Sequence, residues 1–151
     1  MKLTLLKLFI IVLLVSCNPA EKKKMFSEVQ TSADDISQQS PEAIESINRG
    51  KDIYTDFCMN CHLPDGKGVA KTFPPLANSD YLMNNRKESI QAIKYGMSGK
   101  ITVNVEVYDG AMAPLGLEND EIADVMNYIT NNWGNTNGKL ITEAEVLAIE
   151  Q

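Results

Sequence analysis

The stretch Cys58-Met59-Asn60-Cys61-His62 decides how this 151-residue chain folds and what it binds. Two cysteines separated by two residues are compatible with a redox dithiol, half of a zinc site or a structural disulfide. The zinc interpretation lacks ligands, because His62 is the only histidine and Cys17 the only other cysteine. A thioredoxin-like dithiol lacks its βαβ context, and here a histidine directly follows the second cysteine.

The Cys-x-x-Cys-His spacing is instead typical of the attachment site of a c-type haem. The short loop brings the sulfurs of Cys58 and Cys61 to one edge of the macrocycle and places the imidazole of His62 on one face of the iron. The sequence therefore predicts one covalently bound haem c with His62 as an axial iron ligand.

The opposite axial position requires a different side chain, because the chain contains no second histidine. A methionine thioether is a common alternative, and it raises the reduction potential. Met126 falls at helical spacing with apolar neighbours, which favours a core position. The glycine, proline and small residues around Met112 form an extended segment that can approach a flat macrocycle, whereas Met97 lies in a turn-rich stretch and Met83 close behind the attachment loop. Met112 is the favoured candidate, with Met97 as its competitor.

The charge balance narrows the class of partner. The chain has 20 acidic and 14 basic residues, a formal net charge of −6, which argues against binding to nucleic acid through a basic surface. An acidic surface suits a redox partner with a basic docking patch, although it also simply keeps a protein soluble. The length suits one domain with additional segments.

The N-terminus has the pattern of a bacterial export signal. Two lysines flank the start of an apolar run over residues 8–15, which is too short to span a membrane comfortably. The run ends at Ser16-Cys17, which resembles the lipobox of bacterial lipoproteins and implies cleavage before Cys17 and lipid on its sulfur. We predict a signal peptide over residues 1–16 and a lipid-anchored flexible tether over 17–40, on the periplasmic side of a bacterial membrane. A plain secretory signal and an uncleaved anchor are the alternatives.

Three stretches have the apolar periodicity of amphipathic helices. The first begins at Ser40-Pro41-Glu42, where a capping residue, a proline and an acid favour a helix start, and it runs into the attachment loop. A shorter helix is expected within residues 79–95. A third is expected over about residues 119–132, where acids in the first turn suit the helix dipole. The pattern predicts an all-α fold.

These helices indicate a single domain over residues 41–135, with three to five helices wrapped around the haem. Their apolar faces would enclose the porphyrin in a low dielectric and leave one edge exposed. Residues 136–151 are expected to form a C-terminal extension. Within it, the stretch Thr142-Glu143-Ala144-Glu145 and the apolar residues after it indicate a short capped helix.

From about Ser46 to Asn135 the chain resembles a class I monohaem cytochrome c domain. The resemblance rests on the attachment motif, on Gly50 where the first and last helices of that family cross, and on Pro74-Pro75-Leu76 after the histidine. The family has aromatic residues packed at the helix crossing. The matching candidates here are Tyr54, Phe57 and Tyr128.

The resemblance implies how the haem pocket is supported. The Pro74 carbonyl is expected to accept the Nδ1 proton of His62 and thereby fix the orientation of the imidazole. Pro75 takes this role if the loop is shifted. Leu76 is expected to pack on the haem.

Residues 95–103, 108–112 and 121–135 are similar to cytochrome domains that serve quinoprotein dehydrogenases, copper nitrite reductases and haem-copper terminal oxidases. The similarity implies a redox partner of one of these classes, and it implies Met112 as the second axial ligand. In that pattern proline directly follows the methionine, whereas Ala113 intervenes here. The detailed geometry of this loop is therefore expected to differ from the family pattern.

The predicted function is one-electron transfer by a His/Met-ligated haem c, without enzymatic activity of its own. No general base, nucleophile or open metal site is evident, because the only histidine is used as a ligand. One alternative is a haem c enzyme or gas sensor whose sixth iron position is open or labile. Another is a permanent haem subunit of a larger oxidoreductase complex, which differs from a mobile carrier in its partner rather than in its chemistry.

Overall fold

The computed structural model describes residues 40–137 and 139–151, and all of these belong to one compact unit. The predicted signal peptide, the lipid on Cys17 and all of the tether except Ser40 lie outside the described residues. Among the helices of the described part, none is both long and apolar enough to cross a membrane.

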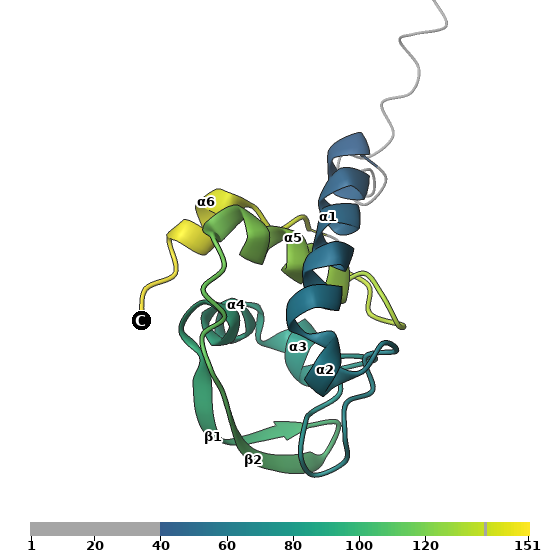
Figure 1. The fold of residues 1–151 in the computed structure, drawn as a ribbon, viewed down its shortest axis with the longest axis vertical. Helices are drawn as coiled ribbons and strands as arrows, with labels where there is room; N and C mark the ends of the chain where they lie inside the picture. The colour runs from purple at the N-terminus through teal and green to yellow at the C-terminus, as the bar shows by residue number, and fades with distance from the viewer. Residues whose placement is uncertain (1–39, 138) are drawn as a thin grey trace, which may run out of the picture. The chain divides into compact units, whose positions relative to one another are not determined.

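The described residues form six α-helices and one antiparallel pair of strands (Figure 1). The predicted all-α fold is confirmed only in that the described part is mostly helical, because the strands were not predicted. In chain order the elements are α1 (Pro41–Phe57), α2 (Met59–His62), α3 (Asp80–Asn84), α4 (Arg86–Tyr95), β1 (Met97–Val103), β2 (Glu106–Met112), α5 (Asn119–Ile129) and α6 (Glu143–Leu147).

Helix α1 begins where its sequence predicts. The Ser40 side chain accepts a hydrogen bond from the Ala43 amide at 3.1 Å, which satisfies one of the free amides of the first turn. The buried residues of α1 recur every three or four positions and so lie on one face of the helix. They are Ala43, Ser46, Gly50 and Tyr54.

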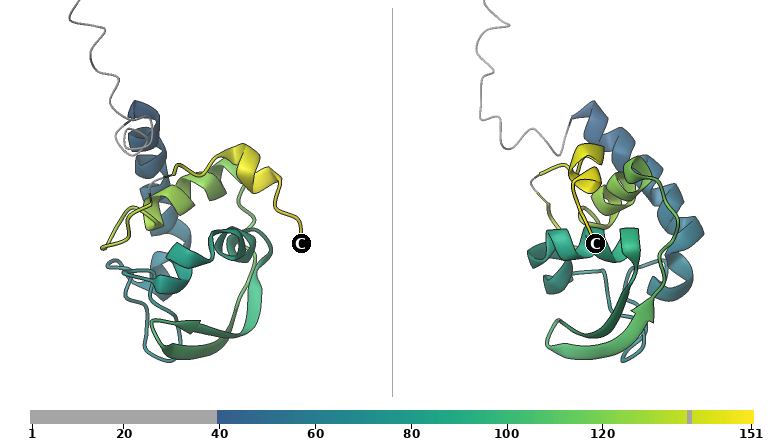
Figure 2. Two further views of the ribbon diagram at one scale, coloured as in Figure 1. Left: turned by 180° about the vertical axis from the view of Figure 1, so that it is seen from behind. Right: turned by 90° about the vertical axis from the view of Figure 1, so that its left-hand side faces the viewer.

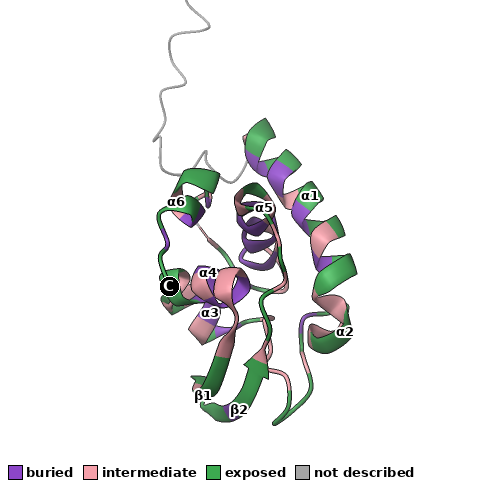
Figure 3. Ribbon diagram, turned by 60° about the vertical axis from the view of Figure 1, so that its left-hand side comes forward, coloured by how far each residue is buried: buried purple, intermediate pink, exposed green. Residues whose placement is uncertain are grey.

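Helix α5 lies at the centre of the fold and is buried around most of its circumference (Figure 3). It crosses α1 at Gly50, where an added Cβ would lie 2.0 Å from the Asp124 carbonyl oxygen, so only glycine allows the two backbones to approach this closely. Beside the crossing, the Asp124 carboxylate accepts hydrogen bonds from Ser46 Oγ at 2.7 Å and Arg49 Nη2 at 2.9 Å. The buried carboxylate is therefore both paired and hydrogen-bonded.

The main correction to the predicted fold is a β-hairpin in place of a loop. Strands β1 and β2 pair in antiparallel register, with Ile101 opposite Tyr108, and Val103 and Tyr108 are buried. The turn between them is Asn104-Val105, and both residues have positive φ, 49° and 64°. A turn of this kind usually contains Asn-Gly, so a valine in the second position hid the hairpin in the sequence.

A second difference concerns the single short helix expected within residues 79–95. The structure has two helices there, because the backbone at Asn85 is not helical between α3 and α4, with φ −122° and ψ 58°. Ser79 caps α3 by accepting a hydrogen bond from the Leu82 amide at 3.2 Å. The split turns α4 into a separate ten-residue helix that leads directly into β1.

The C-terminal extension packs on the helical domain. Thr142 caps α6 by accepting a hydrogen bond from the Glu145 amide at 3.2 Å. Ile141, Val146 and Ile149 are buried in the same core as α5. Figure 2 shows α6 beside α5 and the end of the chain next to α4. The extension is thus part of the core rather than a separate appendage.

Candidate haem-binding site

A cavity of about 290 Å³ lies between the helices and the hairpin, near the lower end of the roughly 300–1,000 Å³ usual for ligand pockets. Its wall is mostly apolar, with contributions from α4, α5, both strands and the segment 72–76. The predicted residues Cys58, Cys61, His62 and Met112 all line it. Side chains that are distant in sequence therefore converge on one apolar space.

The attachment loop is continuous with α1. The helix ends at Phe57, and the His62 amide donates to the Cys58 carbonyl at 2.9 Å, so that α2 forms a single turn. Cys58 is half-buried, Cys61 is exposed, and both are free thiols. Burial raises the pKa of the Cys58 thiol to about 11, with a smaller contribution from Cys61. Cys58 is therefore protonated at neutral pH.

His62 has a defined tautomer. Its Nδ1 lies 3.0 Å from the carbonyl oxygen of Pro74, and since a carbonyl can only accept, Nδ1 carries the hydrogen. The Nε2 lone pair is then free to bind a metal. Burial lowers the pKa of His62, an effect that the Pro74 hydrogen bond partly opposes. The imidazole is therefore neutral at physiological pH, the form that binds iron.

The loop that carries Pro74 is fixed by its own backbone. The Leu76 amide donates to the Gly66 carbonyl at 2.7 Å and the Gly68 amide to the His62 carbonyl at 2.9 Å. Gly68 has φ +62°, and an added Cβ would lie 2.7 Å from the Pro74 carbonyl oxygen. Leu76 and Pro75 also line the cavity. The Pro74 carbonyl is thus held in place by a tightly folded loop.

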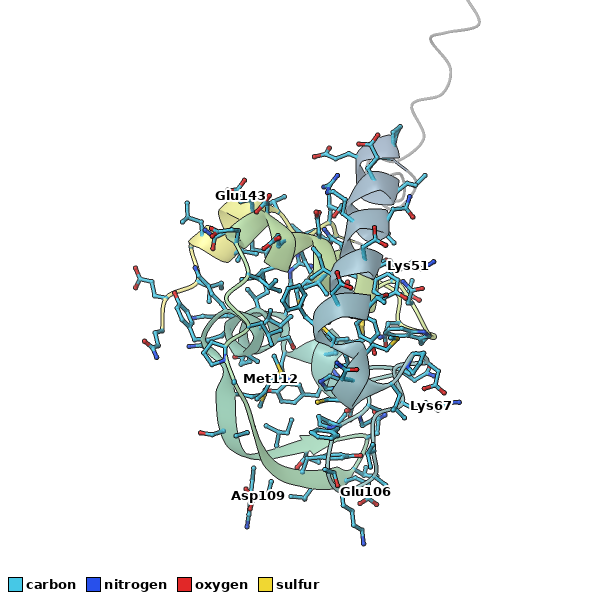
Figure 4. The ribbon with its side chains drawn as sticks, in the orientation of Figure 1. Lys51, Lys67, Glu106, Asp109, Met112 and Glu143 are labelled. Carbon is cyan, nitrogen blue, oxygen red and sulfur yellow. The ribbon has the colours of Figure 1, made fainter. Side chains whose placement is uncertain are left out.

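On the hairpin side, Met112 ends β2 and pairs with Met97, the first residue of β1. Both line the cavity, as does the fully buried Met126 of α5. Figure 4 shows Met112 between the hairpin and the helices, whereas the labelled charged side chains point outward. The structure therefore brings three of the four candidate methionines to the cavity, and the choice of Met112 as ligand stays a prediction.

The aromatic cluster at the helix crossing differs in one member from the prediction. The ring centroids of Tyr54 and Tyr128 are 5.4 Å apart, and Trp133 lies 4.9 Å from Tyr54. Phe57 instead lines the cavity and is 48 % exposed. The Tyr54 hydroxyl donates to the Leu63 carbonyl at 2.6 Å, which ties the attachment loop to the cluster. The helix crossing therefore also supports the site.

Ser89 was missed by the sequence analysis. It lies on α4, is 7 % exposed, lines the cavity, and its hydroxyl has no hydrogen-bond partner among the described residues. In the sequence, Ser89 is marked only by its place directly before the apolar Ile90, on a helix with an apolar face. An apolar cavity with a free imidazole nitrogen, thioethers, two free thiols and one orphan hydroxyl fits a flat, apolar, metal-containing group with some polar substituents.

The cytochrome c family model matches residues 47–133 of the chain. Cytochrome c-552 of Thermus thermophilus is 37 % identical over 90 residues, which cover 56 % of this chain and 68 % of that protein. The cytochrome c subunit of alcohol dehydrogenase (quinone) from Komagataeibacter europaeus is 32 % identical over 111 residues, 64 % of this chain and 21 % of that subunit. The fructose dehydrogenase cytochrome subunit of Gluconobacter japonicus is 26 % identical over 114 residues, 72 % and 23 % of the two chains. The matched region thus spans about a fifth of the dehydrogenase subunits.

Proposed function

Because the chain belongs to the cytochrome c family of electron carriers with covalently attached haem c, we propose that it is a class I carrier with one haem in the cavity described above. One observation carries the proposal: His62 and Met112 line the same apolar cavity as Cys58 and Cys61. The sequence contains one attachment motif and one histidine, which supports a single haem.

Cys58 and Cys61 would hold the group covalently. Each thiol would add across one vinyl group, with a sulfur–carbon bond formed and the thiol hydrogen taken up by the adjacent carbon. The two cysteines are not joined in a disulfide, which is compatible with this role. The first lies at the C-terminal end of α1 and the second in α2, so the protein end of each bond belongs to a short, hydrogen-bonded segment.

His62 and Met112, which line the same cavity, would hold the iron through the imidazole Nε2 and the thioether sulfur. When bound, the haem supplies one iron that accepts and releases a single electron. The Pro74 carbonyl orients the imidazole through Nδ1 and increases the basicity of Nε2. The thioether of Met112 and the apolar wall favour the reduced state of the metal, because a low dielectric disfavours net charge.

We propose that the protein is exported and held by a lipid on Cys17 at the periplasmic side of a bacterial membrane. The support is the sequence alone, because Cys17 lies outside the described residues. The partner we propose is a quinoprotein dehydrogenase, with a copper nitrite reductase or a terminal oxidase as further candidates. The names of the relatives favour the first, since two of them are cytochrome subunits of dehydrogenases. The same names favour a permanent subunit as the second candidate function.

The experiment is to produce the chain with a c-type maturation system and record its visible spectra. We expect one haem per chain, low-spin ferric iron and the weak methionine-to-iron charge-transfer band. Met112→Ala should abolish this band and Met97→Ala should keep it. High-spin iron, or rapid carbon monoxide binding to the untreated ferrous protein, would contradict the carrier and favour an enzyme or sensor.

The anchor has its own test. Cys17→Ser should move the protein from the membrane to the soluble periplasmic fraction, because the lipid can no longer be attached. Ser27→Ala is the matched control, since it lies in the predicted tether outside the lipobox and leaves the cysteine in place. Unchanged membrane association of the Cys17→Ser variant would contradict the lipoprotein prediction.

A further inference from the structure

The C-terminal extension, residues 136–151, contacts both ends of α4, and it lies beyond the part of the chain that matches the family model. At the first residue of α4, Arg86 forms an ion pair with Glu145, with Nε to Oε1 at 2.6 Å. Its guanidinium also donates to the carbonyls of Lys139 at 2.9 Å and Leu140 at 3.2 Å. This end of the helix is therefore well fixed to the extension.

The other end of α4 is held by two adjacent side chains. Lys94 Nζ donates to the carbonyls of Val146 at 2.8 Å and Ile149 at 3.0 Å. The Tyr95 hydroxyl donates to the same Ile149 carbonyl at 2.9 Å. The Val146 carbonyl also accepts from the Ile149 amide at 3.1 Å, so Lys94 is a second donor there. The Ile149 carbonyl, just beyond α6, accepts from both side chains.

These contacts lie directly beside the hairpin that carries Met112. Tyr95 is the last residue of α4 and is followed by Gly96, where an added Cβ would lie only 2.7 Å from the Met112 carbonyl oxygen. The next residue, Met97, is the strand partner of Met112. The end of α4 and the backbone of Met112 are thus in contact, and a displacement of one displaces the other.

We propose that Lys94 and Tyr95, held by the C-terminal extension, position Met112 for iron ligation and limit its dissociation. This inference rests on the proposed ligand role of Met112. The Arg86 contacts provide a built-in comparison: they bind the same extension to the same helix, but about 14 Å further along the helix axis from Tyr95. Contacts at the Lys94 end act on the methionine, and contacts at the Arg86 end act on overall stability only.

The test measures how fast imidazole replaces the methionine in the ferric holoprotein, a reaction that requires the methionine–iron bond to open. Tyr95→Phe should increase the rate about fivefold, the factor for one lost hydrogen bond, and Lys94→Met, which loses two, should increase it at least as much. Each should also weaken the charge-transfer band and lower the reduction potential. Lys94→Arg should retain the donors and stay near the original rate. Tyr95→Phe keeps the ring, over which Lys94 Nζ lies at 5.3 Å.

Arg86→Met and Lys87→Met are the controls. Arg86→Met should destabilise the fold at least as much as Lys94→Met and yet change the imidazole rate less than about twofold, and Lys87→Met should have no effect on either. Equal rates for the Arg86 and Lys94 variants, or unchanged rates for Lys94→Met and Tyr95→Phe, would overturn the inference. A charge-transfer band that is absent from the unmodified protein, or that survives Met112→Ala, would instead contradict the proposed ligand.

Discussion

The two walls of the cavity are built by different means. On the His62 side, the ligand and the carbonyl that orients it are 12 residues apart, and the loop between them is fixed by its own hydrogen bonds. On the Met112 side, the supporting contacts of Lys94 and Tyr95 join residues 52 and 54 positions apart. The difference teaches that one proposed ligand is placed by local structure, and the other by contacts between segments distant in the sequence.

Removing each ligand should separate the two sides most strongly. His62→Ala should abolish low-spin haem and sharply reduce the yield of haem-containing protein, because the attachment motif itself is broken. Met112→Ala should keep covalent haem, lose the charge-transfer band and lower the reduction potential, because the thioether is no longer present to bind the iron. Haem staining of denaturing gels together with visible spectra measures both. A His62→Ala protein with an unchanged visible spectrum would contradict the proposed role of His62 as an iron ligand.

Substitution by alanine should be far more costly at Gly50, at the crossing of α1 and α5, than at Gly110 in the hairpin. Gly50→Ala should destabilise the fold by about 3 kcal/mol, because the new Cβ meets the Asp124 carbonyl at 2.0 Å. Gly110 in β2 has its nearest neighbour, Thr72 O, at 3.9 Å, and Gly110→Ala should change stability by less than about 0.5 kcal/mol. Chemical denaturation of the two variants measures the difference. Similar losses would show that the α1–α5 crossing is looser than the contact indicates.

The attachment of the C-terminal extension at Arg86, away from the hairpin, should make the stability of the fold depend on pH. Hydrogen bonding and charge from Arg86 lower the pKa of Glu145 against a smaller effect of burial. A folded-state pKa below the unfolded value means that the pair stabilises the fold above about pH 4.5 and that this contribution is lost as the pH falls further. Between pH 7 and pH 3, the free energy of unfolding measured by urea denaturation should therefore fall more for the unmodified chain than for Glu145→Gln. Identical pH profiles would contradict the role of the pair.

The smallest effect is expected at the rim of the His62 loop. Asp65 and Lys67 form an ion pair at 2.8 Å, with both side chains at least half exposed. Solvent and salt screen such a pair. Lys67→Ala should leave both the unfolding midpoint and the visible spectrum unchanged. A shift in either would mean that the loop around Gly66 is held partly by surface charge rather than by its backbone hydrogen bonds.

Sequence analysis worked best where structure depends on neighbouring residues. The start of α1 follows from Ser40 and Pro41, and the cap of α6 from Thr142. The hairpin was missed because Asn104-Val105 adopts a turn that sequence rules assign to Asn-Gly. For Ser89 no pattern distinguishes a buried hydroxyl from an exposed one. The roles of His62, Pro74 and Met112 toward a haem remain predictions.

The packing of the C-terminal extension on α4 could not be predicted either, and the contacts between them show why. Lys94, Tyr95 and Gln91 all donate to backbone carbonyls of the extension. A carbonyl is present at every position, so no residue type in the extension marks these pairs. Only the positions of the two backbones determine which acceptors are in reach.

The hairpin turn has one more contact, and it bears on the order of assembly. Asn104 and Asp80 exchange reciprocal hydrogen bonds, amide to side-chain oxygen, at 3.0 Å and 2.7 Å across 24 residues of sequence. These two hydrogen bonds cannot form during synthesis until the turn has left the ribosome, whereas the residues of α1 and the attachment loop precede α3 in the chain. In a chain that emerges N-terminus first, the attachment motif is thus present before the hairpin wall of the cavity, and α5 and α6 follow the hairpin and complete the core.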